Sequence, residues 1–320
     1  MSDLQFISRA LQLFEKQSRE NLLYREYIHQ LRQKSTGLTA LDQLPFLPIS
    51  FFKTHTIQTG VFEPELFFES SGTTGAVNSR HVVRDLKSYL SNTEKNFKEF
   101  YGDPTEYCFL GLLPSYLERG NSSLVAMVDY FITMSSHTSS GFFLHDFKKL
   151  YEVLIELEAK KQKTILIGVT FALLDFLEQF SLQLKHTIVM ETGGMKGRKT
   201  ELTRAELHEI LKKGFGVASI HAEYGMTELM SQAYSKGDGI FYPASTMRIL
   251  LRSMDDPFEM WSADEHIMRT GVINVIDLAN KDSIGFIATE DLARFTGNGG
   301  IELLGRIDNT DMRGCSLLTA

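Results

Sequence analysis

The chain has 320 residues, of which 43% are hydrophobic and 23% charged, so it can bury a large core in one or two domains. Its formal net charge is −7 without a basic stripe, which argues against a nucleic-acid partner. No long apolar run suggests a transmembrane segment, and the N-terminus lacks the pattern of a signal peptide. Two cysteines are too few for a disulfide framework, so we expect a cytoplasmic protein.

The N-terminal segment predicts helix. Apolar residues recur at helical spacing over residues 2–35, and we interpret this segment as a helical cap over the main domain. Prolines in 44–50 end the helix, and 51–69 reads as extended with a turn near 62–64.

A glycine- and hydroxyl-rich loop follows the apolar run Leu66–Phe68. Glycine permits close backbone approach to a ligand, and successive N–H groups form a concavity for anions. The loop therefore predicts a phosphate cradle, although the Gly-Lys-Ser/Thr ending of a Walker loop is missing. The alternative is an ordinary surface turn. The loop residues are Ser70, Ser71, Gly72, Thr73, Thr74 and Gly75.

Beyond the loop, predicted strands and helices alternate, which is typical of a parallel α/β sheet. Helices are expected over 85–101, 124–134, 147–161, 171–180 and 203–213, and buried strands over 107–113, 164–169, 187–190 and 217–221. Ligands of such sheets bind at the carboxyl ends of the strands. Because Glu191-Thr-Gly-Gly194 and Glu223-Tyr-Gly-Met-Thr-Glu228 follow strands directly, we expect the motifs to converge on one site.

From about residue 240, short β-like runs separated by turns predict a smaller β-rich subdomain. The expected organisation has four parts: a helical N-terminal cap (1–50), a nucleotide-binding α/β core (51–235), the β-rich subdomain (236–305) and a hinge-like tail (306–320).

The glycine loop and four motifs downstream of it together resemble those of the adenylate-forming superfamily, which includes acyl-CoA synthetases and peptide-synthetase adenylation domains. The four motifs are Glu191-Thr-Gly-Gly194, Glu223-Tyr-Gly-Met-Thr-Glu228, Glu290-Asp-Leu292 and Gly305-Arg-Ile-Asp308. The resemblance implies an α/β fold: the large N-terminal domain of the superfamily, with mostly parallel sheets flanked by helices, plus the small β-rich subdomain. It also implies ATP as a substrate and Mg²⁺ as a cofactor.

Within that superfamily the chain looks like the acyl-protein synthetase (LuxE-type) family from about residue 45 onward. The residues that carry this resemblance are 113–125, 193–198 and Arg313-Gly-Cys-Ser316. The family activates a fatty acid and passes it through an enzyme cysteine to a partner protein, such as a reductase or a carrier.

The superfamily resemblance gives roles to the glycine loop and to the motif after it. The loop would hold the β- and γ-phosphates, and Arg80 would supply a positive charge in place of a lysine found in many members; the alternative is an arginine at a surface helix cap. Thr227 would contact the α-phosphate, and Glu228 would bind Mg²⁺, which prefers oxygen ligands. The alternative for Glu228 is a carboxylate that interacts with a helix dipole.

The adenosine would be bound by residues from several motifs. Tyr224 would stack on adenine beside Gly225, with core packing as the alternative, while Gly193 and Gly194 would flank the purine. Further along the chain, Asp291 would hold the ribose, although Thr289-Glu-Asp291 lacks the glycine usual in that motif, and Arg306 would lie near ribose and phosphate. The alternative for Arg306 is a turn ion pair with Asp308 or Asp311.

Cys315 matches the acyl-carrying cysteine of the acyl-protein synthetases, and Arg313 would favour its thiolate. A free thiol at a frayed end is the alternative. CoA-ligating members carry a swivelling C-terminal domain with a catalytic lysine, which we expect to be absent here.

The substrate pocket is less defined. Ser115 and Tyr116 are candidates for one wall, and His221 for lining the pocket or orienting substrate, with a buried core histidine as the alternative. The 23 phenylalanines suit an acyl chain or a large core equally.

The main hypothesis is an ATP-dependent acid–thiol ligase of the long-chain fatty acid–protein type. Direct ligation to CoA or to a carrier protein, with the missing domain supplied in trans, is one alternative, and an adenylate-binding scaffold without chemistry is another. Expected partners are a carboxylic acid and an acyl-accepting protein, and a homo-oligomer is compatible with the sequence.

Overall fold

A computed structural model describes residues 1–70, 77–114, 121–193, 202–263 and 269–307. By its internal contacts the chain divides into two compact units. One unit comprises Met1–Phe51, Ile57–Val61 and Thr246–Ala320, and the other comprises Phe52–Thr56 and Phe62–Ser245. We call them the terminal unit and the central unit. The linear four-part division predicted from the sequence stays a prediction about domain boundaries.

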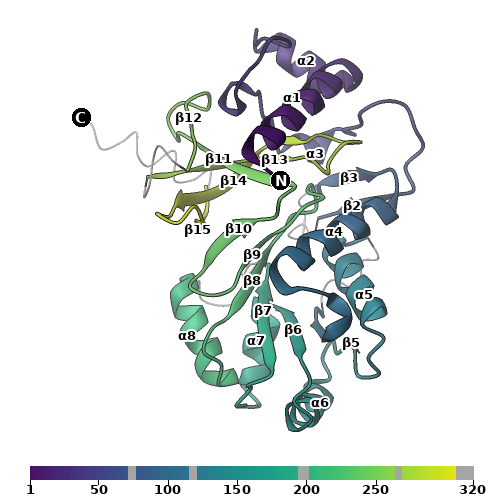
Figure 1. The fold of residues 1–320 in the computed structure, drawn as a ribbon, viewed down its shortest axis with the longest axis vertical. Helices are drawn as coiled ribbons and strands as arrows, with labels where there is room; N and C mark the ends of the chain where they lie inside the picture. The colour runs from purple at the N-terminus through teal and green to yellow at the C-terminus, as the bar shows by residue number, and fades with distance from the viewer. Residues whose placement is uncertain (71–76, 115–120, 194–201, 264–268, 308–320) are drawn as a thin grey trace. The chain divides into compact units, whose positions relative to one another are not determined.

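The central unit is built on a mixed sheet whose strands follow the order β10-β9-β8-β7-β6-β4-β5 (Figure 1). Neighbours from β5 to β8 pair in parallel, and β8, β9 and β10 pair antiparallel. A separate hairpin is formed by β2 and β3. The strands are β2 (Leu66–Glu69), β3 (Arg80–Val83), β4 (Cys108–Leu112), β5 (Gly141–Phe142), β6 (Thr164–Val169), β7 (Thr187–Thr192), β8 (His221–Tyr224), β9 (Ala233–Ser235) and β10 (Ile240–Pro243).

Helices flank this sheet, as the alternating sequence pattern predicts. They are α4 (Leu86–Tyr101), the 3₁₀ turn η2 (Pro104–Glu106), α5 (Ser123–Ser135), α6 (Phe147–Ala159), α7 (Thr170–Leu177) and α8 (Arg204–Phe215). The single turn α3 (Phe51–Thr54) precedes the β2–β3 hairpin in the chain. Polar caps explain where two of them begin. The Asp85 carboxylate accepts hydrogen bonds from the first turn of α4, and Thr203 forms a capping box with Glu206 at the start of α8.

The central core lies between these helices and the parallel strands. Every residue of β4 and β6 is buried, which confirms the interpretation of their continuous apolar runs as strands covered on both faces. Cys108 lies in this core, where burial raises the pKa of its thiol.

Two local predictions for this unit are wrong. The strand expected over 217–221 is instead His221–Tyr224, because α8 ends at Gly216 in a left-handed conformation and the ladder with β7 begins only at His221. The extended segment expected from residue 51 begins with the helical turn α3, which buries Phe52. A single turn is too short to show helical periodicity.

The terminal unit contains an antiparallel sheet with the strand order β12-β11-β13-β14-β15, and β1 adds to β14 in parallel. This sheet confirms the β-rich texture predicted near the C-terminal end. Its elements are α1 (Asp3–Glu20), α2 (Leu22–Gln30), the 3₁₀ turn η1 (Leu41–Gln43), β1 (Leu47–Pro48), β11 (Met247–Arg252), β12 (Met260–Trp261), β13 (Thr270–Asp277), β14 (Phe286–Phe295) and β15 (Ile301–Arg306).

The N-terminal helices pack on the antiparallel sheet of their own unit. Phe14 of α1 lies edge-to-face with Phe286 of β14, with ring centroids 5.9 Å apart. The buried Gln17 side chain donates to the Asn280 carbonyl at 2.9 Å and accepts from the Gly285 amide at 2.9 Å. The sequence predicted helix here but placed it over the main domain, so the observed docking is a finding of the structure.

Candidate active site

The glycine loop joins the two strands of the β2–β3 hairpin. Ser70 closes the base of this loop: its amide donates to the Ser79 carbonyl at 3.0 Å, and its hydroxyl accepts from the Ser79 amide at 2.9 Å. The other predicted cradle residues (Ser71, Gly72, Thr73, Thr74 and Gly75) lie outside the described residues, so the cradle stays a prediction.

Arg80 lies in β3 directly across from Glu69 of β2. Its guanidinium Nε is 3.2 Å from Glu69 Oε1, and the group stacks over the Phe67 ring at 4.3 Å from the centroid. The helix-cap alternative for Arg80 is therefore wrong, because the residue is in a strand. A role with phosphate stays a prediction, and it requires Arg80 to share its charge with Glu69.

His81, the next residue of β3, was missed by the sequence analysis. It is fully buried, its Nδ1 is 2.8 Å from the Thr227 carbonyl oxygen, and its ring meets Phe52 edge-to-face. The hairpin strand therefore contacts the loop that carries Thr227 and Glu228. A lone histidine in a strand gives no sequence signal for this contact.

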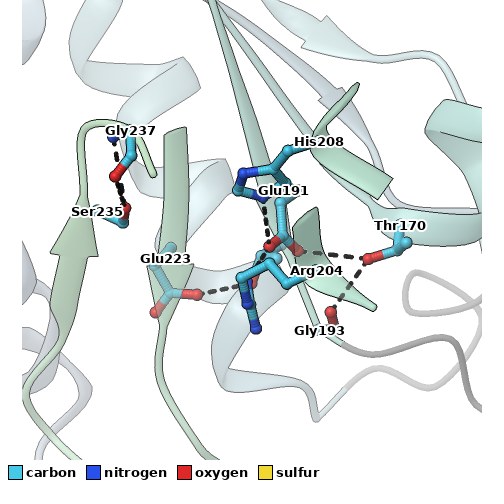
Figure 2. A network of polar contacts seen from close by, with 9 residues as sticks. Thr170, Glu191, Gly193, Arg204, His208, Glu223, Ser235 and Gly237 are labelled. Atoms are coloured by element: carbon cyan, nitrogen blue, oxygen red, sulfur yellow. Dashed lines mark hydrogen bonds and ion pairs between the residues drawn. The ribbon is translucent and has the colours of Figure 1, made fainter. Parts of the chain in front are cut away.

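The carboxyl end of β7 holds a buried polar network around Glu191 (Figure 2). Glu191 Oε1 accepts a charged hydrogen bond from the Arg204 guanidinium and lies 3.4 Å from His208 Nε2. The Thr170 hydroxyl lies 3.3 Å from Glu191 Oε2 and 3.2 Å from the Gly193 carbonyl. The network thus fixes the backbone at Gly193, where the predicted adenine-binding segment begins.

The motifs in the sequence assign no role to the partners of Glu191. Arg204 and His208 are four residues apart at the start of α8 and therefore share one helix face. That spacing, after a motif that carries a carboxylate, is the signal that could have found them.

The carboxyl end of β8 brings together the residues of the second predicted motif. Tyr224 is buried, meets Phe241 edge-to-face and donates to the Met226 sulfur at 3.4 Å. Thr227 and Glu228 follow in the turn after the strand, and Glu228 is only 5% exposed. The structure therefore brings Gly193 and the Tyr224–Glu228 segment to the ends of two neighbouring parallel strands, as expected.

Glu228 fits the predicted magnesium role in its chemistry. The Glu228 side chain is a buried carboxylate, and its oxygens are the kind of ligand that Mg²⁺ prefers. Proteins usually hold Mg²⁺ with one or two carboxylates together with substrate phosphates. Within the described ranges, no group of three or more His, Cys, Asp or Glu side chains forms a self-sufficient metal site. An Mg²⁺ ion held by Glu228 would therefore take its other ligands from nucleotide and water.

His221 begins β8, and its Nδ1 is 3.1 Å from the Tyr101 hydroxyl. Burial lowers the pKa of His221 to about 4, and the nearby positive charge of Lys236 adds to this effect. The imidazole is therefore neutral at physiological pH. This arrangement has the features of a core histidine with a hydrogen-bond partner, and its place in a substrate pocket stays a prediction.

Asp291 and Arg306 belong to the terminal unit. They stand opposite each other in β14 and β15, and Arg306 Nε donates to Asp291 Oδ1 at 2.8 Å. The ion-pair alternative for Arg306 named Asp308 or Asp311, which lie outside the described residues; the pair observed here is with Asp291. Thr289-Glu-Asp291 is part of a continuous strand rather than a loop.

Three further predicted residues lie outside the described residues: Ser115 and Tyr116 of the substrate wall, and Gly194 of the purine site. The proposed acyl carrier Cys315 also lies outside them. In the described part of the chain, no helix is long and apolar enough to cross a membrane.

Comparison with known proteins rests on structure. A scan against protein-family models finds no match, and a sequence comparison with curated proteins finds none either. ATP-bound MatB from Rhodopseudomonas palustris matches with a TM-score of 0.53 and 19% identity over 75% of this chain and 47% of MatB. The chain thus spans about half the length of MatB.

Two other ligases match over more of the chain. An open conformation of 2-hydroxyisobutyryl-CoA ligase in complex with 2-HIB-AMP and CoA gives a TM-score of 0.65 at 12% identity, over 96% of this chain and 70% of that one. A long-chain-fatty-acid-CoA ligase from Archaeoglobus fulgidus gives 0.52 at 13% identity, over 81% and 56%. At these identities the likeness concerns the fold. The chain has the mixed α/β fold of the N-terminal domain of adenylate-forming ligases.

Proposed function

We propose that this protein activates a carboxylic acid with MgATP. One observation carries the proposal: the carboxyl ends of β7 and β8, in a fold shared with ATP-bound MatB, present Gly193 beside the Tyr224–Glu228 segment. Ligands of open α/β sheets bind at this edge. A buried carboxylate, a hydroxyl and an aromatic ring in one short segment match the needs of metal, phosphate and adenine.

In the proposed reaction, a carboxylate oxygen of the acid attacks the α-phosphorus of ATP, and the bond to the β-phosphate bridging oxygen breaks. The products are acyl-AMP and pyrophosphate. Thr227 donates a hydrogen bond to the α-phosphate, and Tyr224 with the Gly193 backbone fixes the adenine. Glu228 would hold Mg²⁺, which would supply positive charge to the phosphates. Catalysis of this kind depends on positioning and charge neutralisation.

The second half of the proposal is transfer of the acyl group to Cys315. Its thiolate attacks the carbonyl carbon of acyl-AMP, and the bond between that carbon and the phosphate oxygen breaks. The acyl group stays on sulfur as a thioester, and AMP leaves with the oxygen. The thioester then passes the acyl group to a nucleophile of a partner protein. A fatty acid is the proposed substrate, supported by the fold shared with the Archaeoglobus ligase and by the resemblance of the Arg313–Ser316 segment to acyl-protein synthetases.

Direct ligation to CoA is the second candidate, because two structural neighbours are CoA ligases. Intact-mass measurement separates the two. The protein and Cys315→Ser are incubated with MgATP and a mixture of carboxylic acids, with pyrophosphate measured in parallel. The proposal predicts a hydroxylamine-labile acyl adduct on the wild type alone. Pyrophosphate release without an adduct would instead favour a separate thiol acceptor, and neither signal would favour an adenylate-binding scaffold.

A further inference from the structure

Glu223 lies where the two motif-bearing strands meet. It is the penultimate residue of β8 and pairs in register with Thr192, the last residue of β7. The Thr192 hydroxyl donates a hydrogen bond of 2.6 Å to Glu223 Oε2. Thr192 directly precedes Gly193, so one oxygen of Glu223 is tied to the start of the predicted adenine-binding segment.

The other carboxyl oxygen of Glu223, Oε1, lies close to Gly225 in the loop that follows β8. A Cβ atom built on Gly225 would lie 2.4 Å from Glu223 Oε1, closer than non-bonded atoms approach. Any side chain larger than hydrogen at position 225 would therefore clash with the Glu223 carboxyl group. Glu223 therefore touches both segments of the candidate site, through Thr192 on one side and Gly225 on the other.

The basic side chains near the ends of β7 and β8 contact Glu191 rather than Glu223. Arg204 and His208 both face Glu191 (Figure 2). Within the described ranges, no basic side chain forms an ion pair with Glu223. The Glu191 carboxylate raises the pKa of Glu223, and Glu223 in turn raises the pKa values of the buried phenols of Tyr101 and Tyr234.

This environment disfavours a charged Glu223. Burial raises the pKa of its carboxyl group from the ordinary 4.5 to about 7; the Thr192 hydrogen bond opposes the rise, and the Glu191 charge adds to it. Near neutral pH the carboxyl group therefore holds its proton in a substantial fraction of molecules.

We propose that Glu223 is a positioning residue of the nucleotide site, which as a neutral acid joins the end of β7 to the turn after β8. The inference rests on the proposed function and deepens it. Ionisation adds a second negative charge, beside that of Glu191, next to the predicted adenine-binding segment. The nucleotide is itself a polyanion, so the ionised carboxylate disfavours its binding. MgATP binding should therefore require the neutral form.

The test measures the Kd for MgATP by titration calorimetry from pH 6 to pH 9, with the full chain. Glu223→Gln mimics the neutral acid and keeps an acceptor for Thr192. If only the neutral form is competent, the apparent Kd of the wild type rises about tenfold at pH 8 and about 100-fold at pH 9. Glu223→Gln should hold tight binding across this range, whereas Glu223→Asp, whose shorter side chain loses reach, should bind weakly throughout.

The chain offers a matched control at the opposite end of β7. There the Glu158 carboxylate accepts a hydrogen bond of 2.7 Å from the Thr187 hydroxyl, far from the motifs along the strand. Glu158→Gln removes a charge of the same kind and should keep the wild-type pH profile, which also corrects for titration of ATP itself.

The outcomes separate the inference from the proposed function. Parallel pH profiles for the wild type and Glu223→Gln would overturn the positioning role alone. If wild-type protein does not bind MgATP at any pH, the proposed function and this inference fall together. Thr192→Val, which removes the donor and keeps the shape, should weaken MgATP binding at pH 6 if the link between the strands matters; unchanged binding would contradict it.

Discussion

Replacing Glu223 by glutamine should make the protein more stable, and by an amount that grows with pH. The folded state keeps the Glu223 proton up to about pH 7, whereas an unfolded glutamate releases it near 4.5. Between these values the folded state binds one more proton than the unfolded state, so the unfolding free energy falls as pH rises. Glutamine has no proton to lose and escapes this decline.

The magnitude follows from the two pKa values. At about 1.4 kcal/mol per pKa unit, a rise from 4.5 to about 7 corresponds to a loss of about 3 kcal/mol once both states are ionised. Part of this loss is already present at pH 5. The stability gap between Glu223→Gln and the wild type should therefore widen by about 2.5 kcal/mol from pH 5 to pH 8.

Urea denaturation at pH 5, 6, 7 and 8 measures this gap, with Glu158→Gln as the control for loss of a carboxylate. Titration of other groups, including His221, is common to the wild type and the variant and cancels in the difference. A gap that stays constant with pH, or that is widest at pH 5, would refute the assignment of a buried and uncompensated carboxyl group.

Three further predictions follow from other contacts. His221→Gln should reduce the loss of stability on acidification. The pKa of His221 is about 4 in the folded state and 6.5 ordinarily, so between pH 4 and pH 6.5 the unfolded state binds more protons and is favoured by acid. Melting temperatures of the wild type and the variant at pH 5 and pH 7.5 test this, and equal acid sensitivity would contradict it. Gln17→Ala should cost about 2 to 3 kcal/mol of unfolding free energy, since two buried backbone groups lose a partner. The neighbouring half-buried Lys16, whose charge pairs with Glu20 at the surface, is the control: Lys16→Ala should change the unfolding free energy by less than about 0.5 kcal/mol, and similar values for both would count against the docking of α1. Asp291→Asn should raise the KM for ATP about tenfold if the carboxylate binds the ribose, as the loss of one charged hydrogen bond implies; an unchanged KM would remove Asp291 from the site.

Much of the central unit could be predicted because local signals and tertiary structure agree there. The caps Asp85 and Thr203 mark helix starts in the sequence itself, and the fully buried β4 and β6 appear as uninterrupted apolar runs. Gly193 and the Tyr224–Glu228 segment could be placed at one edge of the sheet, because parallel strands bring their carboxyl ends together.

What could not be predicted depends on pairing between distant segments. The strand position of Arg80 could not be predicted, because nothing local reveals its hairpin partner Glu69. The ion pair of Asp291 with Arg306 depends on the register of β14 and β15. The docking of α1 depends on a backbone carbonyl, that of Asn280, which is 263 positions from Gln17 in the sequence. Glu191 and Glu223 both stand near the end of a strand and just before a glycine motif, so the sequence gives no reason to treat them differently. Only the packing shows that Glu191 has the basic partners and that Glu223 does not.

Acid-dependent exchange of labelled pyrophosphate into ATP tests the central claim most directly, because it requires reversible formation of acyl-AMP and does not depend on the final acceptor. The wild type is assayed with a panel of carboxylic acids that includes fatty acids, beside Glu228→Gln, which keeps the size of the side chain and removes its charge. We predict exchange with at least one acid in the wild type and a loss of at least about 100-fold in Glu228→Gln, as expected when a ligand of the catalytic metal is removed. Exchange that is absent with every acid, or that proceeds equally in the variant, would contradict the proposal that this site activates a carboxylate.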